Sequence, residues 1–268
     1  MNGLDIVVTG GAGFIGKHLV DELLINNNVT VIDNLNSGSE DVITHHFEKE
    51  NFTFVKGDIQ SEKLVRDVLK GKDVVFHLAA ISEVESSVKQ SSEIYTVNFG
   101  GTVNLLKAFT GELFVFTSLV EVGETDLNPY LRSKYMAEWA IKKSGKPHVV
   151  FRLANVYGPG SRSVVQTFIE SEEIRIFGDG NQTRDFVFVD DVVGHLMNAW
   201  GLRGKSLYHV GSGVRTTINH LANLVKRIVG DKAVTYIPLR EHEILHPGIK
   251  TDLICPTSLE EGIRKCLP

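Results

Sequence analysis

The fold is decided by residues 9–16, which read Thr9-Gly10-Gly11-Ala12-Gly13-Phe14-Ile15-Gly16. Three of the glycines recur at every third position, directly after a β-branched run at 4–9 and before a stretch in which apolar residues recur at spacing four. A tight strand-to-helix turn needs glycine where a Cβ would clash, and the helix N-terminus offers free N–H groups and a positive dipole end to an anion. The stretch therefore predicts a first βαβ unit that binds the pyrophosphate of a dinucleotide.

Strand-like and helix-like stretches alternate from this unit onward. Strands are expected at 29–33, 52–55, 73–78, 113–117 and 148–153, and helices at 93–109 and 131–143. Such alternation predicts an α/β fold, a Rossmann-type parallel sheet with helices on both faces. Beyond residue 155 the strands are shorter, at 174–177 and 186–189, before a helix at 191–200 and a strand at 206–210. We expect a dinucleotide-binding domain at 1–154, rejoined by about 187–215, and a smaller substrate lobe over most of 155–268.

Composition excludes several classes of partner. The 268-residue chain has a formal net charge of -5, an isoelectric point near 6.1 and no basic run, which excludes nucleic acid and an anionic membrane surface as partners. Cys255 and Cys266 have no His or Cys at ligand spacing, so we expect neither disulfide nor metal. The sequence shows no export segment and no long apolar run, so a cytoplasmic location is expected.

Two carboxylates are candidates for binding a dinucleotide. Asp33 ends the second strand, where a carboxylate can accept both ribose hydroxyls of the adenosine and repel a 2′-phosphate. This position favours NAD over NADP, and the alternative is a simple strand-end turn residue. Asp58 follows the third strand and could reach the adenine edge, or serve only as a helix N-cap or turn residue.

A second constellation combines Tyr130, Lys134 and Ser118. Tyr130 and Lys134 are four residues apart at the start of an expected helix, and Ser118 follows the strand before it. That spacing places Tyr and Lys on one helix face, where the ammonium can stabilise a phenolate and lower the pKa of the tyrosine. The tyrosine then becomes a usable base near neutral pH. The alternative is a surface pair without function.

These motifs, taken together, resemble a known family. The chain is similar to the extended short-chain dehydrogenases/reductases, in the branch of nucleotide-sugar epimerases and dehydratases, and most of all to UDP-glucose 4-epimerases. The resemblance covers nearly the whole chain and rests on TGGAGFIG at 9–16, DNLNSG at 33–38, GDI at 57–59, HLAA at 77–80, VNFGGTVNLL at 97–106, the Tyr-Lys pair, FRLANVYGPG at 151–160, IFGDGNQTRDFVFVDDV at 176–192 and YHVGSG at 208–213.

The resemblance implies a role for each matching residue. Tyr130 would move the sugar hydroxyl proton, Lys134 would hold the nicotinamide ribose and support the phenolate, and Ser118 would hydrogen-bond the reacting oxygen. NAD would be retained as a catalyst that takes a hydride from sugar C4 and returns it. Other expected NAD contacts are Gly10, Gly13, Phe14, Ile15, Gly16, Asp33, Asn34, Ser37, Gly38, Asp58, Ile59, Leu78, Ala79, Ala80 and Asn98. Expected contacts to a UDP-sugar are Ser82, Ser118, Asn155, Phe177, Arg184 and Arg240.

Residues 117–123 distinguish reactions within the family. Similar dehydratases and decarboxylases carry acidic residues just after the catalytic hydroxyl, because they move a second proton or steer a carboxylate. Here Leu119 and Val120 stand there, and Glu121 is displaced; in an extended segment one position reverses the side-chain direction. We therefore expect a UDP-glucose 4-epimerase type of reaction. The alternatives are a related dehydratase or dehydrogenase, and a non-catalytic NAD-binding regulator.

The chain departs from the family pattern at three places. Val122 replaces a usual tyrosine, and the connection 123–130 is short, which predicts a more open sugar pocket. His246-Pro247-Gly248 resembles a nucleotide-holding motif without its charged ends, for which Arg240 is a substitute.

The helices expected at 93–109 and 131–143 form the dimer face in many similar enzymes, so a homodimer is expected.

Overall fold

The structure is a computed structural model that describes the chain except residues 1, 83–90, 123–127, 203–206, 241–243 and 268. The chain forms two compact units. Unit 1 comprises Met1–Arg152 and Val193–Tyr208, and unit 2 comprises Leu153–Val192 and His209–Pro268. Each unit is described by itself below.

Unit 1 is built on a parallel sheet. The sheet has the order β14-β11-β6-β5-β4-β1-β2-β3, of which β6 to β3 form the part described here. The register pairs Val7 with Thr30 on one side and with Val75 on the other. The bounds are β1 (Asp5–Thr9), β2 (Asn28–Asp33), β3 (Phe52–Lys56), β4 (Val74–His77), β5 (Leu113–Leu119) and β6 (His148–Leu153). The central strands read as nearly continuous apolar runs because helices cover both faces. The expected Rossmann-type sheet is confirmed.

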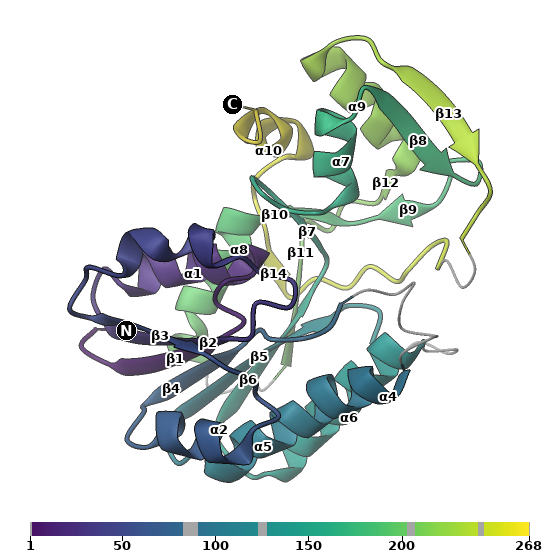
Figure 1. Ribbon diagram of the computed structural model, residues 1–268. Coiled ribbons are helices and arrows are strands. Elements are labelled where there is room, and N and C mark those ends of the chain that lie inside the picture. The colour runs from purple at the N-terminus through teal and green to yellow at the C-terminus, as the bar shows by residue number, and fades with distance from the viewer. Residues whose placement is uncertain (1, 83–90, 123–127, 203–206, 241–243, 268) are drawn as a thin grey trace. The chain divides into compact units, whose positions relative to one another are not determined.

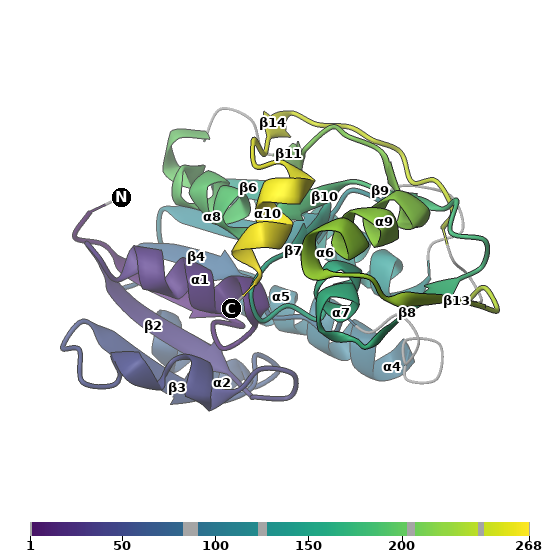
Figure 2. The ribbon, with the colours of Figure 1, turned by 90° about the horizontal axis from the view of Figure 1, so that it is seen from above.

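Helix α1 (Phe14–Leu23) lies over β1 and β2 on one face, whereas α2 (Glu62–Leu69), α5 (Thr102–Ala108) and α6 (Pro129–Lys143) lie on the other (Figures 1 and 2). Two of these helices have side-chain N-caps. The Ser61 hydroxyl caps α2, and Asn128 caps α6, which has proline at its first position. The short helices η1 (Glu40–Val42), η2 (Thr44–His46) and η4 (Ala199–Leu202) complete the unit. Among the described residues, no helix is long and apolar enough to cross a membrane.

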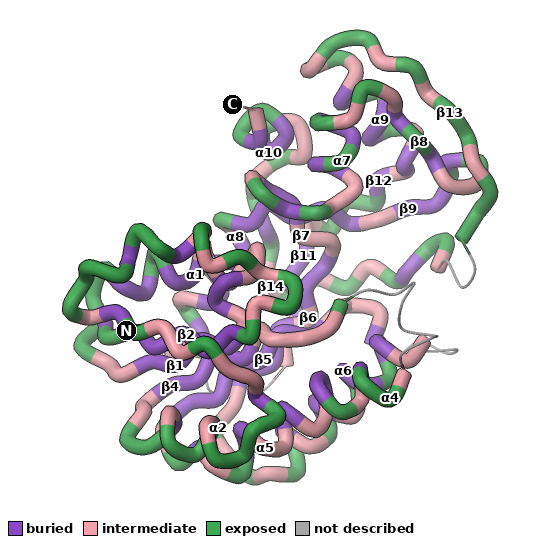
Figure 3. Tube along the Cα trace, in the orientation of Figure 1, coloured by how far each residue is buried: buried purple, intermediate pink, exposed green. Residues whose placement is uncertain are grey.

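The core of unit 1 joins the sheet to α2, α5 and α6. Phe109, Phe114 and Phe116 are fully enclosed in it, and the central strands β4 and β5 are almost entirely buried (Figure 3). The rigid sheet fixes the ends of β1, β2, β4 and β5, from which the candidate site residues project.

The helix expected at 93–109 is present as one helical stretch, but its middle is π-helical rather than α-helical. The chain there forms α4 (Ser91–Ile94), a π-helical segment η3 (Tyr95–Gly101) and α5. The widened turn coincides with the weak helix formers Gly100 and Gly101 and with Asn98, whose side chain bonds backbone groups outside the helix. Strand β5 also runs two residues beyond the expected 113–117, so Ser118 lies within the strand.

Unit 2 has its own core and only short strands. Its elements are β7 (Asn155–Tyr157), α7 (Val164–Glu170), β8 (Glu173–Phe177), β9 (Thr183–Arg184), β10 (Phe186–Phe188), β12 (Thr216–Thr217), α9 (Ile218–Val229), β13 (Ala233–Ile237), β14 (Leu253–Ile254) and α10 (Leu259–Lys265). Tyr157, Phe168 and Leu221 are at its centre. The pairs β8–β13 and β7–β10 are parallel.

Three elements contribute residues to both units, and one of them is β6, whose last residue, Leu153, belongs to unit 2. Helix α8 (Val189–Met197) begins in unit 2 and ends in unit 1, and β11 (Leu207–Gly211) begins in unit 1 and ends in unit 2. The expected helix at 191–200 therefore starts earlier and stops at Met197, where Asn198 donates its side-chain N–H to Gly194 O at 2.9 Å. The expected strand at 206–210 is shifted to β11, and residue 206 lies outside the described residues.

Candidate active site

The glycine-rich turn has the geometry that a bound pyrophosphate requires. Gly10 has a φ of 74°, and a Cβ there would lie 2.7 Å from Ala79 N. A Cβ at Gly16 would overlap the Gly10 carbonyl oxygen, so the helix can approach the turn only with glycine there. Gly13 is the N-cap of α1 and provides no side-chain cap, and the first turn, which holds Phe14 and Ile15, carries no acidic residue. Its N–H groups can therefore receive an anion.

Asp33 is a buried carboxylate at the end of β2. One oxygen accepts the Ala12 N–H at 3.0 Å and the other accepts the Leu35 N–H at 2.8 Å. Burial raises the pKa of Asp33, and the two backbone hydrogen bonds oppose that rise. The side chain thus ties the glycine-rich turn to the strand end, where its charge can also face a ribose.

The segment after Asp33 packs against the glycine-rich turn. A Cβ at Gly38 would lie 2.5 Å from Ala12 O, and Asn34 donates its side-chain N–H to Asp58 at 2.8 Å. Asp58 also accepts the Gln60 N–H at 2.8 Å, so it is a turn residue. Its alternative role as helix N-cap is wrong, because Ser61 caps α2. Of the remaining expected contacts here, Ser37 lies between Asn34 and Gly38 in sequence, and Ile59 is buried beside Gly101.

A series of buried hydrogen bonds centred on His77 supports the segment that holds Leu78, Ala79 and Ala80. The Ala79 N–H donates to Thr9 Oγ1 at 3.3 Å, and Thr9 Oγ1 lies 2.7 Å from His77 Nδ1. On its other side His77 Nε2 lies 2.8 Å from Thr102 Oγ1, which donates to Asn98 O at 2.6 Å. Burial holds the pKa of His77 well below its usual range, so the ring is neutral. The sequence analysis gave His77 no role.

Asn98 continues this series to the helix that carries the Tyr-Lys pair. Its side-chain oxygen accepts the Ile81 N–H at 2.8 Å, and its amide donates to Ser133 Oγ at 3.0 Å. Ser133 in turn donates to Tyr130 O at 2.7 Å. The candidate cofactor residue Asn98 therefore also connects Ile81 to helix α6 through hydrogen bonds.

Tyr130, Lys134 and Ser118 lie on two adjoining elements, α6 and β5, and all three are buried. Lys134 Nζ donates to Thr117 O at 2.9 Å and lies 4.6 Å from the centre of the Phe116 ring. Among the described residues, the buried Ser118 hydroxyl has no hydrogen-bond partner. A hydroxyl in that state is available for a substrate oxygen.

The acidities of the pair differ from the expectation. Burial lowers the pKa of Lys134 to about 8, and nearby Glu138 opposes the shift. Burial also raises the pKa of Tyr130, and the Glu121 charge adds to the rise. The expectation of a lowered pKa for Tyr130 is therefore wrong for this structure, because desolvation of the phenolate dominates. In this state Tyr130 is a proton donor.

Glu121 does not follow the extended geometry that the sequence analysis assumed. Strand β5 ends at Leu119, and the Val122 N–H donates to Leu119 O at 3.1 Å, so the chain turns here. A turn removes the alternation that would direct Glu121 away from the site, and its charge raises the pKa of Tyr130. The argument against an acidic group near the catalytic hydroxyl therefore fails.

Unit 2 holds the residues expected to bind the nucleotide end. Arg184 lies on β9 and donates from Nη1 to Thr183 O at 2.7 Å. The guanidinium carbon of Arg240 lies 3.9 Å from the centre of the Phe177 ring, and Asn155 on β7 donates its backbone N–H to Asp185 O at 2.9 Å. These contacts bring Phe177 and Arg240 together, as a planar cation over an aromatic ring.

Asp185 is a residue whose role the sequence analysis missed. Its buried carboxylate accepts the Ser212 N–H at 3.0 Å, the Ser212 hydroxyl at 2.5 Å and the Gly213 N–H at 3.0 Å. It therefore fixes the strand of Arg184 to the turn after β11. Asp185 lies in the motif at 176–192 and its partners lie in the motif at 208–213, so the contact joins two segments that are distant in sequence.

The departures from the family pattern lie partly outside the described residues. The short connection at 123–130 includes residues 123–127, which are not described. The expected substrate contact Ser82 is an exposed residue directly before 83–90, which are also not described. His246 lies 3.1 Å from Thr183 Oγ1 through its Nδ1, and Leu245 O accepts the Thr183 N–H at 2.8 Å. The segment that contains His246 therefore runs beside the strand of Arg184.

Comparison with known proteins identifies the family. The model of the NAD-dependent epimerase/dehydratase family matches residues 6–199, and the chain belongs to this family. Its cofactor is NAD, and the uncapped α1 N-terminus, the glycine-rich turn and Asp33 fit that dinucleotide. The chain is an enzyme of the epimerase, dehydratase and decarboxylase group.

Individual relatives carry out different reactions. A UDP-glucose 4-epimerase of Mycolicibacterium smegmatis is 33% identical over 257 residues, which cover 84% of this chain and 82% of the relative. A UDP-N-acetyl-alpha-D-glucosaminuronate decarboxylase of Bacillus cytotoxicus is 28% identical over 270 residues, covering 88% of this chain and 84% of the relative. Among solved structures, the UDP-glucose 4-epimerase of Thermotoga maritima with UDP-glucose has a TM-score of 0.86 at 30% identity and covers 99% of this chain and 97% of that one.

Proposed function

We propose that this enzyme is a nucleotide-sugar 4-epimerase of the UDP-glucose/UDP-galactose type. The observation that carries the proposal is the group formed by Tyr130, Lys134 and Ser118: a tyrosine and a lysine on the buried face of one helix, beside a buried serine hydroxyl with an unused hydrogen bond. Such a group moves a proton at a sugar hydroxyl. The solved epimerase with UDP-glucose supports this substrate class.

The chain's own residues then have distinct tasks. Ser118 Oγ would donate a hydrogen bond to the reacting oxygen, and Tyr130 Oη would take the hydroxyl proton and later return it. The ammonium of Lys134, which donates to Thr117 O, would favour the phenolate through its positive charge. The residues around the glycine-rich turn and Asp33 would hold NAD, which would supply reversible hydride transfer at sugar C4. Since Tyr130 is protonated in this structure, it is poised for the returning step.

The nucleotide end is assigned to unit 2. Arg184 would bind the substrate diphosphate through charge-assisted hydrogen bonds, with Asn155 as a polar neighbour. Phe177 would line the base pocket, and the stacked Arg240 would supply the positive charge that the segment of His246 lacks. The proposal is supported by Asp185, which holds β9 against the turn after β11.

A second function, dehydration or decarboxylation of a nucleotide sugar, is favoured by Glu121. Its charge reaches Tyr130, so the site has a second group that can exchange a proton. Epimerisation needs only one proton-transfer group, because the hydride leaves and returns at a single carbon. The two functions therefore differ in whether a carbon-bound hydrogen is exchanged with water.

The deciding experiment is turnover in deuterium oxide. Purified enzyme is incubated with UDP-glucose, UDP-galactose, their N-acetyl forms and UDP-glucuronate, and the products are separated and examined by mass spectrometry and NMR. A 4-epimerase interconverts a pair of sugars and places no solvent deuterium on carbon. Loss of water or carbon dioxide with deuterium on carbon would instead establish the second function, and Glu121→Gln would then abolish it.

A homodimer is part of the proposal. On α6, Tyr135 and Trp139 have exposed fractions of 47% and 56%, and their spacing of four places them on one helix face. Large exposed apolar side chains in a row are typical of an interface. Sedimentation of the purified protein should give twice the chain mass, and Trp139→Glu should shift it toward the monomer.

A further inference from the structure

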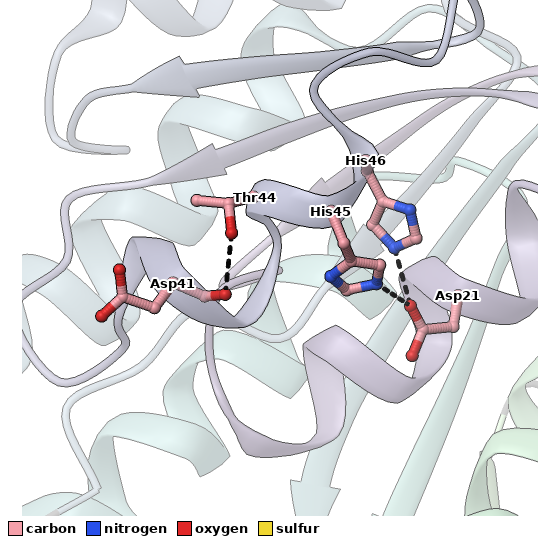
Figure 4. A network of polar contacts seen from close by, with 5 residues as sticks. All are labelled: Asp21, Asp41, Thr44, His45 and His46. Carbon is pink, nitrogen blue, oxygen red and sulfur yellow. Dashed lines mark hydrogen bonds and ion pairs between the residues drawn. The ribbon is translucent and has the colours of Figure 1, made fainter.

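Three side chains outside the active site converge on one point in unit 1. Asp21 lies on α1, and His45 and His46 lie on η2. Their Nε2 atoms lie 3.1 Å and 2.7 Å from the same carboxylate oxygen of Asp21. Figure 4 shows both imidazole rings turned toward that oxygen, and the ring centres are 3.8 Å apart.

The distances suit a metal ion with small adjustments. All three donor atoms lie within 4.8 Å of one another. A tetrahedral zinc ion with bonds of about 2.0–2.1 Å separates its ligand atoms by about 3.3 Å, so each histidine nitrogen needs to move away from the Asp21 oxygen by only a fraction of an ångström. The side chains of His45 and Asp21 are 57% and 46% exposed and can make that shift, whereas His46, at 2%, is held in place.

The chemistry of the donors also suits a transition metal. Two imidazoles and one carboxylate form a ligand set that suits zinc, cobalt and nickel better than it suits calcium or magnesium. His46 Nδ1 has no partner among the described residues, so an outer hydrogen bond would not strengthen this ligand.

We propose that Asp21, His45 and His46 form a binding site for one divalent transition metal ion, with water completing its coordination. The ion fastens η2 to α1. The chain just before η1 contacts the glycine-rich turn, where the Ser39 N–H donates to Ala12 O at 3.3 Å. A bound metal therefore stabilises the dinucleotide-binding region of unit 1 without taking part in proton transfer.

The test uses the full chain without a polyhistidine tag, freed of metal by a chelator. Titration with Co²⁺, followed by visible absorption, should show one saturable site per chain, and Zn²⁺ should displace the cobalt. The melting temperature should rise with either ion, since the metal binds only the folded form. These readouts do not depend on the catalytic reaction, so they stand apart from the proposed function.

Substitutions separate this site from adventitious binding. Asp21→Asn and His45→Asn alter exposed side chains, so the fold should persist, and each should weaken cobalt binding at least about tenfold. His220→Asn, at an exposed histidine of α9, is the matched control and should bind cobalt as the original protein does. Absence of saturable binding, or equal affinity in Asp21→Asn, His45→Asn and the control, would overturn the proposal.

Discussion

Replacing Lys134 by methionine should stabilise the NAD-free protein at neutral pH while it destroys activity. Methionine has nearly the length of the lysine stem, so it fills the same space without the charge. Turnover should fall by about 10²–10⁴-fold, as for loss of a group that supports acid-base catalysis, and NAD should bind less tightly. The increase in stability follows because Lys134 is a buried ammonium whose local ion pairing is weak.

The magnitude follows from the pKa of Lys134. Burial lowers it from 10.5 to about 8, and at 1.36 kcal/mol for each pH unit the charged form costs the folded state about 3.4 kcal/mol. The substitution also removes the hydrogen bond to Thr117 O, which contributes roughly 0.5–1.5 kcal/mol. The net gain in the free energy of unfolding is therefore about 2 kcal/mol at pH 7.

The sign of the pH dependence provides a second check. Below pH 8 the lysine is protonated in both the folded and the unfolded state, so the full cost is present. Between pH 8 and 10.5 the unfolded chain holds a proton that the folded chain has released, and the stability of the original protein rises with pH. The variant lacks this rise, so its advantage should shrink to nearly zero at about pH 9.5–10.

The assay is urea unfolding of both proteins, freed of NAD, at pH 7 and pH 9.5. Lys142→Met is the control, because Lys142 is an exposed lysine of the same helix and should alter neither the stability nor its pH dependence appreciably. Destabilisation by Lys134→Met at pH 7, or an equal advantage at both pH values, would refute the argument that the ammonium is buried at a net cost.

Three further predictions concern the remaining site residues. Tyr130→Phe should lower turnover by about 10²–10⁴-fold with unchanged melting temperature and NAD content, whereas a purely structural tyrosine would lower stability as well. Asp33→Asn should narrow the preference for NAD over NADP in binding titrations, because the amide no longer repels a 2′-phosphate; equal affinity of the original protein for both nucleotides would contradict the role of Asp33. Arg184→Ala should weaken nucleotide-sugar binding by roughly 1.5–3 kcal/mol in calorimetry while NAD content stays constant.

The parallel sheet could be predicted because its strands are buried on both faces and therefore read as apolar runs between helical periods. The glycine-rich turn could be predicted for a steric reason, since Gly10 and Gly16 have no room for a Cβ. The π-helical segment around Asn98 could not, because it depends on bonds from that side chain to Ile81, which is distant in sequence. Local periodicity carries no information on such contacts.

The same reason explains the errors at the catalytic pair. The spacing of Tyr130 and Lys134 correctly placed both on one helix face, but the pKa of each depends on burial, which the spacing does not report. The proximity of Glu121 depends on a turn after Leu119 that apolar residues did not signal. The convergence of Asp21 with two histidines is likewise a property of tertiary structure.

The buried histidine of the HLAA motif is part of a hydrogen-bond network that reaches the helix of the candidate catalytic pair. Thr102 donates its single hydroxyl proton to Asn98 O, so it must accept the N–H at His77 Nε2. The other ring nitrogen then accepts the hydroxyl of Thr9, which is left to accept the Ala79 N–H. Each hydrogen bond in this series therefore has a fixed donor and a fixed acceptor. A second proton on His77 would require one of the two threonine hydroxyls to exchange its donor role for an acceptor role. Since burial keeps the ring neutral, the order persists, and it joins the segment beside the glycine-rich turn to the helical segment of Asn98, from which further hydrogen bonds reach the backbone of Tyr130.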